Sequence, residues 1–393
     1  MKSLYFESMI SNGRDENTLE NPFSVKEYKG QEYFCDRGEE VDKLNLNIRN
    51  GIDTTLISPR RMGKTGLIYR FFESLEQIND IEPIYVDIYA ARSLSDFVKL
   101  LAEAILIKFP EQTTIGHQFI EFIKGFKPLI GYDALTGEPQ IQIAYQTAQE
   151  KEYSLQSLFR FLDMQDSNIV LAIDEFQQIR EFPEKNIEAL LRTYTQQLKK
   201  VRFIYCGSKK TIMLDIFSNT KRPFYGSTQF LLLDKINLGQ YSEFIKLMYN
   251  KHGIEIEEEA LNFILTWTKR HTFFTQSVCN MVFSMAAKLV TVNEVKHACK
   301  ELLKVNEPIY FQYRQLLTAG QWNFLIAIAK EDEVTQLTAQ NFLAKYEIGT
   351  PANARRISRS LIEKELILET LGKKLNSYQV YDVFLSRWLA SEY

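Results

Sequence analysis

The stretch Leu56-Ile-Ser-Pro-Arg-Arg-Met-Gly-Lys-Thr-Gly-Leu67 decides the fold of this 393-residue chain. It follows a short apolar run and opens a segment whose apolar residues have helical spacing. Backbone N–H groups of such a loop, together with the first turn of the following helix, form a concave anion-binding site. The stretch therefore predicts a strand, a phosphate-binding loop and a helix, in that order.

Residues 58–66 of this loop supply most of the predicted nucleotide contacts. We expect Lys64 to reach the β- and γ-phosphates of ATP and the Thr65 hydroxyl to ligate Mg²⁺. Ser58 departs from the strict pattern, because a glycine normally stands there; serine is tolerable if its φ stays negative. The predicted contacts are Ser58, Pro59, Arg60, Arg61, Met62, Gly63, Lys64, Thr65 and Gly66.

A second motif, Asn168-Ile-Val-Leu-Ala-Ile-Asp-Glu175, is an apolar run that ends in two acids. We expect Asp174 to hold Mg²⁺ through water and Glu175 to act as the general base. The alternative is a buried strand with acids at its exposed end, and the presence of both motifs in this order disfavours it. Ser208, which follows the run Arg202–Cys206, is a weaker catalytic candidate, since it also fits a simple turn.

Five apolar runs of four to eight residues predict buried strands, and helical patterns separate most of them. They are Thr54–Ser58, Ile84–Ile88, Ile169–Ile173, Arg202–Cys206 and Gln229–Leu233. The alternation indicates an α/β, doubly wound parallel sheet. Residues 126–147 break the rhythm and predict an inserted β-hairpin around Thr136-Gly137.

The rest of the chain has a different pattern. Residues 240–304 predict helices only, with breaks near Gly253 and His271. Helices over 321–330, 338–345 and 352–364, followed by strands over 366–371 and 378–384, describe a winged helix. We therefore expect a core over 1–236 with residues 1–20 loosely ordered, a helical lid over 237–312 and a winged-helix domain over 313–393.

At these motifs the chain resembles the archaeal-type ATPases, a STAND-like branch of the AAA+ superfamily. The stretches that carry the resemblance are Asn21-Pro-Phe23, Tyr33–Val41, Pro59–Thr65, Tyr85–Tyr89, Ile173–Gln177, Gly207-Ser208 and Arg222–Gly226. The resemblance implies a P-loop core with strand order 5-1-4-3-2, a helical lid and a C-terminal winged helix. It also implies that the N-terminal segment, with Phe34 and Arg37, lies near the adenine.

The chain departs from this family at three places. Ser58 replaces a loop glycine, and Ser227 stands where the family has arginine, so that Arg222 or Lys221 would have to substitute. Arg270-His-Thr-Phe-Phe274 stands where related ATPases have a Gly-x-Pro motif in the lid. His271 is therefore either a lid residue that approaches the nucleotide or an ordinary residue at a helix start, and we favour the second interpretation.

The third helix of the predicted winged helix has a basic face. Ala354, Ile357 and Leu361 share one side of this helix, and Arg355, Arg356 and Arg359 fall on the other. Lys373 and Lys374 add charge in the predicted wing, an arrangement that suits DNA. However, from Arg314 onward ten Lys and Arg residues face nine Asp and Glu residues. We therefore favour an intramolecular or protein contact over DNA binding.

Composition excludes several other classes of protein. The net charge of −3 and the pI near 6.0 exclude a molecule that binds polyanions over its whole surface. The four cysteines and four histidines are scattered, which disfavours disulfides and zinc sites and fits a reducing compartment. No apolar run of 18 residues occurs, so we expect a cytoplasmic protein without a membrane span.

The primary functional hypothesis is an ATPase that acts as a nucleotide-driven molecular switch with Mg²⁺, ATP and ADP as ligands. A protein client and an oligomer are compatible with the sequence. The main alternative is a DNA-binding or defence-type regulator in which ATP is a structural or regulatory ligand with negligible turnover. A scaffold without nucleotide is the third, and only Ser58 points to it.

Overall fold

The computed structural model describes residues 21–76, 80–126, 128–143, 145, 147–285, 288–370 and 375–393. The chain divides into two compact units. One is Glu27–Ile236, here called the α/β unit. The other, the helical unit, is Asn237–Tyr393 together with the segment that ends at Lys26. The expectation for residues 1–20 lies outside the described residues, and the division into three domains stays a prediction.

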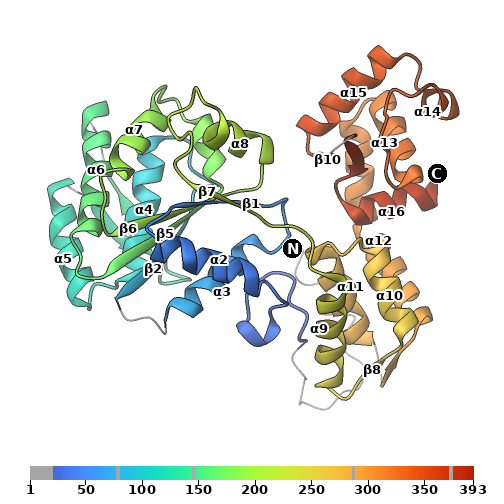
Figure 1. Ribbon diagram of the computed structural model, residues 1–393, viewed down its shortest axis with the longest axis horizontal. Helices are drawn as coiled ribbons and strands as arrows, with labels where there is room; N and C mark the ends of the chain where they lie inside the picture. The colour runs from blue at the N-terminus through green and yellow to red at the C-terminus, as the bar shows by residue number, and fades with distance from the viewer. Residues whose placement is uncertain are drawn as a thin grey trace. The chain divides into compact units, whose positions relative to one another are not determined.

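A parallel five-stranded sheet is the framework of the α/β unit (Figure 1). Its strands are β1 (Thr54–Ile57), β2 (Ile81–Asp87), β5 (Asn168–Asp174), β6 (Val201–Gly207) and β7 (Gln229–Leu232). Their spatial order is β2-β5-β6-β1-β7. Numbered along the chain without the hairpin strands, this is the predicted order 5-1-4-3-2 read from the other edge. β6 therefore lies between the two strands that carry the sequence motifs.

Side chains of the strands alternate between two apolar layers, one on each face of the sheet. Val170 and Ile204 pack with the helices α2 (Gly38–Arg49) and α3 (Lys64–Leu75). Their neighbours Leu171 and Phe203 point to the opposite layer. That layer is covered by α4 (Leu94–Lys108), α5 (Thr114–Ile123), α6 (Ala148–Asp163), α7 (Ile187–Thr195) and α8 (Lys210–Ser218). Both faces are thus buried, which explains the continuous apolar runs.

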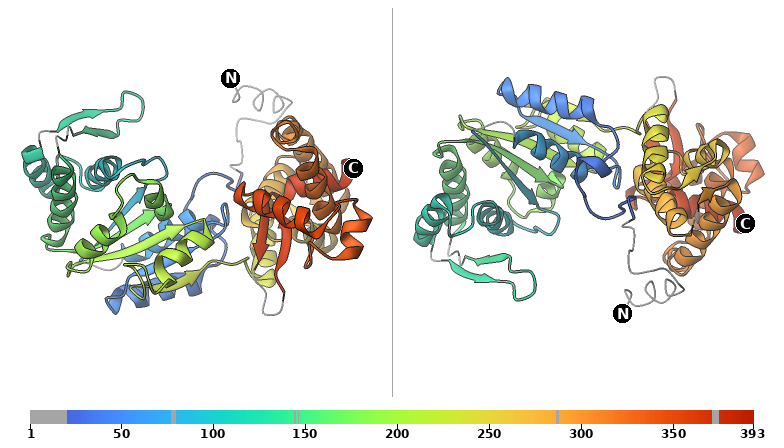
Figure 2. Two further views of the ribbon diagram at one scale, coloured as in Figure 1. Left: turned by 90° about the horizontal axis from the view of Figure 1, so that it is seen from above. Right: turned by 90° about the horizontal axis from the view of Figure 1, so that it is seen from below.

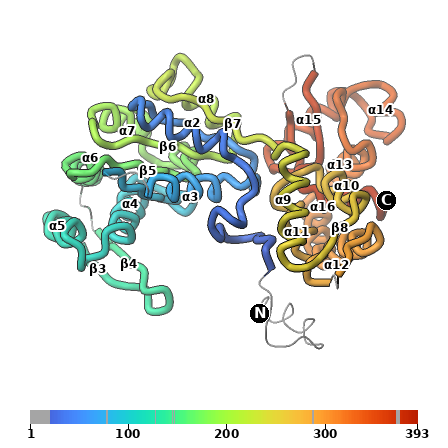
Figure 3. The backbone as a smooth tube through the Cα atoms, turned by 60° about the horizontal axis from the view of Figure 1, so that its bottom comes forward, coloured from blue at the N-terminus to red at the C-terminus, as the bar shows by residue number. Residues whose placement is uncertain are grey.

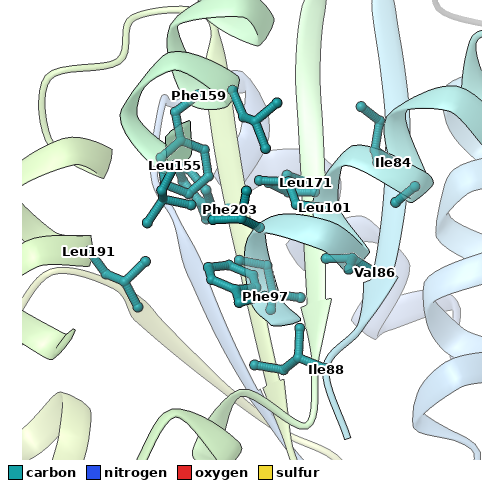
Figure 4. Packing of buried hydrophobic residues seen from close by; sticks show 14 of the residues in the cluster. Ile84, Val86, Ile88, Phe97, Leu101, Leu155, Phe159, Leu171, Leu191 and Phe203 are labelled. Atoms are coloured by element: carbon teal, nitrogen blue, oxygen red, sulfur yellow. The ribbon is translucent and has the colours of Figure 1, made fainter. Parts of the chain in front are cut away.

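The larger layer is held mainly by α4 and α6 (Figure 4). Phe97 and Leu101 of α4 and Phe159 of α6 converge with Phe203 of β6, and all four are fully buried. Each such side chain contributes roughly 1.5–3 kcal/mol by leaving water. This packing fixes the strands and thereby the loops at their carboxyl ends.

The hairpin predicted over 126–147 is present. It consists of β3 (Leu129–Tyr132) and β4 (Pro139–Gln142), which pair antiparallel. Figure 2 shows it standing off the body of the α/β unit. Ile141 anchors it, because this side chain is fully buried and its N–H donates to Glu103 Oε1 of α4 at 2.8 Å.

Four helices begin the helical unit (Figure 3). They are α9 (Leu238–Asn250), α10 (Glu258–Trp267), α11 (Thr272–Met285) and α12 (Val292–Leu316), with a short parallel pair, β8 (Glu255–Ile256) and β9 (Leu289–Val290). Thr291 and Glu294 form a capping box that starts α12. Phe23 packs into this unit, with its ring centroid 4.9 Å from that of Tyr249. No helix in the described part of the chain is long and apolar enough to span a bilayer.

The C-terminal segment forms the predicted three helices and two-stranded wing, followed by a helix that the sequence interpretation missed. The elements are α13 (Ala319–Glu331), α14 (Gln340–Lys345), α15 (Pro351–Glu363), β10 (Ile367–Thr370), β11 (Ser377–Val380) and α16 (Val383–Glu392). The strand predicted over 378–384 ends at Val380. Asp382 then caps α16 by accepting the Leu385 N–H at 3.0 Å.

The two faces of α15 are as predicted. Ala354, Ile357 and Leu361 are buried. Arg355, Arg356 and Arg359 are exposed. Lys373 and Lys374 of the predicted wing lie outside the described residues.

Candidate active site

The candidate site lies at the carboxyl edge of the central strands. Ile57 of β1 is in register with Gly207 of β6, and Asp174 of β5 is in register with Asp87 of β2. The residues that follow these strands therefore meet at one edge of the sheet. In open α/β sheets, this is where ligands bind.

Two residues of the loop after β1 have a left-handed backbone. Gly63 has φ +92° and stands immediately before Lys64, the first residue of α3, and Arg61 also has a positive φ of 63°. Ser58 is absent from the described non-glycine residues with positive φ, as the sequence analysis required. Its N–H donates to the Gly207 carbonyl at 3.2 Å, so it extends the pairing of β1 with β6.

Lys64 links the two motifs. Its Nζ lies 2.5 Å from Asp174 Oδ1 and 3.1 Å from Glu175 Oε1. Burial would lower the pKa of Lys64, but the charges of Asp174 and Glu175 outweigh burial and hold this pKa above its ordinary value. Lys64 is therefore a buried cation fixed between two carboxylates.

Asp174 also accepts two hydroxyl donors. Thr65 Oγ1 lies 3.2 Å from Asp174 Oδ2, and Tyr85 donates to the same oxygen at 2.9 Å. Burial and the charge of Asp174 raise the pKa of Tyr85, so its phenol stays protonated and keeps donating. Thr65 and Asp174 were predicted from the sequence, whereas Tyr85 was not, although this residue stands two positions before the end of β2.

The donor set at this edge fits Mg²⁺. Thr65 and Asp174 offer adjacent oxygen ligands, and Asp87 and Glu175 add negative charge near them. Mg²⁺ prefers oxygen and keeps several waters, so it needs few protein ligands. Burial raises the pKa of Asp87, and the charges of Asp174 and Glu175 add to this effect. Among the described residues, no cluster of three or more His, Cys, Asp or Glu side chains could hold a metal alone.

Glu175 is held from three sides. Ser208 Oγ lies 2.9 Å from Glu175 Oε2, Gln177 Nε2 donates to the same oxygen, and Lys64 contacts Oε1. The backbone of Glu175 is left-handed, with φ 55°, and it precedes the short helix η3 (Phe176–Glu181). The structure thus brings Ser208 to Glu175, as a catalytic interpretation requires, and adds Gln177.

Phe34 lies beside the loop, whereas Arg37 is engaged elsewhere in the α/β unit. The Phe34 ring packs on Gly66 so closely that a Cβ there would be 2.8 Å from Phe34 Cε2. Arg37 is 4% exposed and donates to the Asp234 carbonyl at 2.6 Å, and it also contacts Glu40. The adenine contacts of Phe34 and Arg37 stay predictions.

The other loop residues differ in exposure. Met62 is buried, Pro59 and Arg60 are half-buried, and Arg61 and Thr65 are exposed. Arg222, considered as a substitute for the missing arginine, contacts Asp215 at 2.8 Å and Glu188 at 3.4 Å.

Comparisons with known proteins agree with this geometry. The sequence profile of a family described as the ATPase domain predominantly from Archaea matches residues 34–269, which is more than half of the chain. The chain belongs to this family of archaeal-type ATPase domains. A second profile, described as a probable winged helix domain, matches residues 308–391. The chain thus joins an archaeal-type ATPase domain to a C-terminal winged-helix domain.

Solved structures share the fold at low sequence identity. A Walker-type ATPase of Pyrococcus abyssi is 19% identical over 94% of this chain and 99% of its own, with a TM-score of 0.64. The ORC2 protein of Aeropyrum pernix, solved as ADPNP and ADP complexes, is 14% identical over 95% and 96%, with a TM-score of 0.57. The ORC1 protein of the same organism, solved with DNA, is 12% identical over 91% and 93%, with a TM-score of 0.50. Among curated protein sequences, no match was found.

Proposed function

We propose that this chain binds ATP with Mg²⁺ at the edge formed by β1, β5 and β6, hydrolyses the γ-phosphate, and acts as a nucleotide-driven switch. The observation that carries the proposal is the junction of the two motifs. Lys64, Thr65, Asp174 and Glu175 come from α3 and from the end of β5, yet they form one contact network.

Each side chain has a task that follows from its position. Lys64 is charged and is the first residue of α3, so it binds the β- and γ-phosphates at the N-terminus of this helix. Thr65 and Asp174 would hold Mg²⁺, directly and through water. When bound, Mg²⁺ would neutralise part of the phosphate charge.

Glu175 is the proposed general base. Its carboxylate accepts the proton of the attacking water, and Ser208 and Lys64 hold it in place. Phe34, packed on Gly66, offers an aromatic surface next to the loop for the adenine. The left-handed backbone at Glu175 carries a strain of order 1–3 kcal/mol, the kind of cost that persists where the surrounding structure enforces it.

The switch would be read out by the helical unit. ATP binding closes the lid helices and repositions the winged helix, and hydrolysis resets them. The A. pernix ORC2 complexes with ADPNP and ADP, which have the same fold, support nucleotide binding in this core. A cytoplasmic location and a protein client stay part of the proposal.

Glu175→Gln separates the switch from its main alternative, in which ATP is a structural ligand. The variant keeps the size of the side chain and removes the base, so it should bind ATP normally and lose turnover by roughly 10²–10⁴-fold. Binding is measured by titration and turnover by phosphate release.

Glu181→Gln is the matched control, because Glu181 ends the same η3 helix and is exposed. It should hydrolyse ATP like the wild type. If Glu175→Gln retained the wild-type kcat, or if the wild type had no measurable turnover, the hydrolytic proposal would fall and the structural-ligand alternative would stand.

A further inference from the structure

Gln177 makes the least expected contact in the site. It lies two residues after Glu175, within η3, and is 6% exposed. Its amide donates to Glu175 Oε2. The assignment of the amide follows from chemistry, because an amide oxygen in that place would face a carboxylate oxygen without a proton between them.

The backbone is shaped to allow this contact. The left-handed conformation of Glu175 turns the chain sharply between β5 and η3, so that the Gln177 side chain returns toward Glu175. Gly207, at the end of β6, gives the amide room. A Cβ at Gly207 would lie 2.5 Å from Gln177 Oε1 and equally close to the Met213 sulfur.

The amide oxygen of Gln177, Oε1, differs from the amide nitrogen in its surroundings. Gln177 Oε1 is buried and accepts no hydrogen bond from the described residues. A buried unsatisfied acceptor costs about 1–3 kcal/mol. A glutamine that served only as packing could be replaced by an apolar residue without this cost. The side chain is therefore better explained by its donor end than by its contribution to the core.

We propose that Gln177 is a positioning residue for Glu175. It holds Oε2 together with Ser208, so that Oε1 faces Lys64 and the phosphate loop. The inference rests on the proposed function, since it assigns to Gln177 the orientation of the proposed base. The residue touches neither nucleotide nor metal in this scheme and acts only through Glu175.

Gln177→Met tests the inference with a side chain of the same length that cannot donate. We expect kcat to fall about tenfold or more, because a positioned base contributes roughly 10²–10⁴-fold and partial misplacement forfeits part of it. KM and the Kd for ATP should stay within about twofold, since Lys64 and Thr65 are untouched. Gln177→Glu, which places a second carboxylate beside Glu175, should lower kcat further.

Gln178→Met is the matched control. Gln178 is the next residue of η3, is half-buried, and donates to the Ala91 carbonyl at 3.1 Å rather than to the site. It should leave kcat and KM unchanged. Thermal unfolding of all variants checks that each is folded.

A double variant separates positioning from structure. If Gln177 acts only through Glu175, Gln177→Met should cause no further loss of turnover in the Glu175→Gln background. The inference is overturned if Gln177→Met keeps the wild-type kcat, if it lowers kcat and ATP affinity together, or if its loss adds fully to that of Glu175→Gln. Should Glu175→Gln abolish turnover while Gln177→Met does not, only this inference fails. An inactive wild type would remove the proposed function as well.

Discussion

Two groups of charged side chains in this molecule have opposite environments. At the sheet edge Lys64, Asp174 and Glu175 are largely buried, and each touches at least one of the others. On α15 Arg355, Arg356 and Arg359 are exposed. Of these three, Arg356 has a described hydrogen bond, to Asn353 Oδ1 at 3.1 Å. Both groups were singled out from the sequence, but only the first is held in one geometry.

The difference in burial determines how much the substitution of a charged side chain should affect stability and function in each place. A buried charge is tolerated only when it is paired and hydrogen-bonded, so its position is determined by its partners. An exposed charge contributes little to stability and can take several rotamers, so it acts mainly through the field that it adds to the surface. Substitutions should therefore have large local effects at the sheet edge and small diffuse effects on α15.

The largest effect is expected for Lys64→Ala. Removal of the cation leaves Asp174 and Glu175 buried without their partner, and breaking such a pair typically costs about 3–5 kcal/mol of unfolding free energy. Because the site also loses the side-chain cation that we propose binds the phosphates, the Kd for ATP should rise at least tenfold, about 1.4 kcal/mol. Chemical denaturation and an ATP titration measure the two quantities.

Lys43→Ala is the control for this change. Lys43 is 60% exposed, and its ion pair with Glu39 is 4.0 Å long. The unfolding free energy should change by less than about 0.5 kcal/mol. Equal ATP affinity in Lys64→Ala and the wild type would refute the assignment of the phosphate loop.

The fold could be predicted because its decisive signals are local. Each buried strand is a continuous apolar run, and the Gly-Lys-Thr triplet and the Asp-Glu pair stand at strand ends where their chemistry is usable. The prediction of a strand over 378–384 was wrong beyond Val380, where α16 soon begins. The error arose because a short apolar run does not by itself distinguish a strand from a buried helix. The signal that could have corrected it was Asp382, a good N-cap residue three positions before Leu385.

The site was less predictable than the fold, because part of it depends on tertiary contacts. Tyr85 reaches Asp174 from the neighbouring strand β2, and Gln177 reaches back to Glu175 after the left-handed turn that precedes η3. No spacing in the sequence marks either contact. Arg37 has partners that the motif did not specify, because its guanidinium bonds to Asp234 and Glu40. Its position near the adenine stays a prediction. A motif therefore identifies which residue types are present, whereas packing decides which partner each side chain finds.

An intermediate effect is expected for Asp332→Asn in the helical unit. Asp332 lies 2.9 Å from Lys269 Nζ and 3.0 Å from Arg387 Nη1. Its carboxylate is half exposed, while both cations are mostly buried. Asparagine tolerates the positive φ of 61° at this position, so the change removes charge rather than backbone fit. We expect a loss of about 1 kcal/mol in unfolding free energy.

Glu331→Gln is the matched control, because Glu331 precedes Asp332 and its cation partner Lys345, at 2.6 Å, is 62% exposed, whereas Lys269 is 12% exposed. Glu331 also accepts a hydrogen bond from Tyr346 at 2.7 Å, which a glutamine can keep. This substitution should cost less than about 0.5 kcal/mol. If the two variants had the same unfolding free energy, the ion pairs of Asp332 would contribute no more to stability than the pair of Glu331 with Lys345. The expected relation between burial of a charge and its effect on stability would then be wrong. The salt dependence of unfolding provides a second measure, since the exposed pair should be screened more strongly.

The smallest effect on stability is expected for the triple variant Arg355→Ala, Arg356→Ala and Arg359→Ala. Exposed substitutions usually change unfolding free energy by no more than about 0.5 kcal/mol each, and the high helix propensity of alanine offsets part of any loss.

The same triple variant tests what this face of α15 does. If it grips DNA, each phosphate contact releases counterions, and log Kobs should fall with log salt with a slope near −0.9 per contact. The fold relative ORC1 was solved with DNA, but the nearly balanced charge after Arg314 disfavours tight non-specific binding here. We therefore expect weak DNA binding at physiological salt and a change in ATP turnover in the triple variant, because the variant would remove the regulatory contact that we propose for this face. Tight, strongly salt-dependent DNA binding that disappears in the triple variant, with turnover unaltered, would show instead that the exposed arginines read a nucleic-acid backbone. In that case the exposed arginines of α15 would have a binding function of their own, unlike the buried charges at the sheet edge, which their partners hold in one geometry.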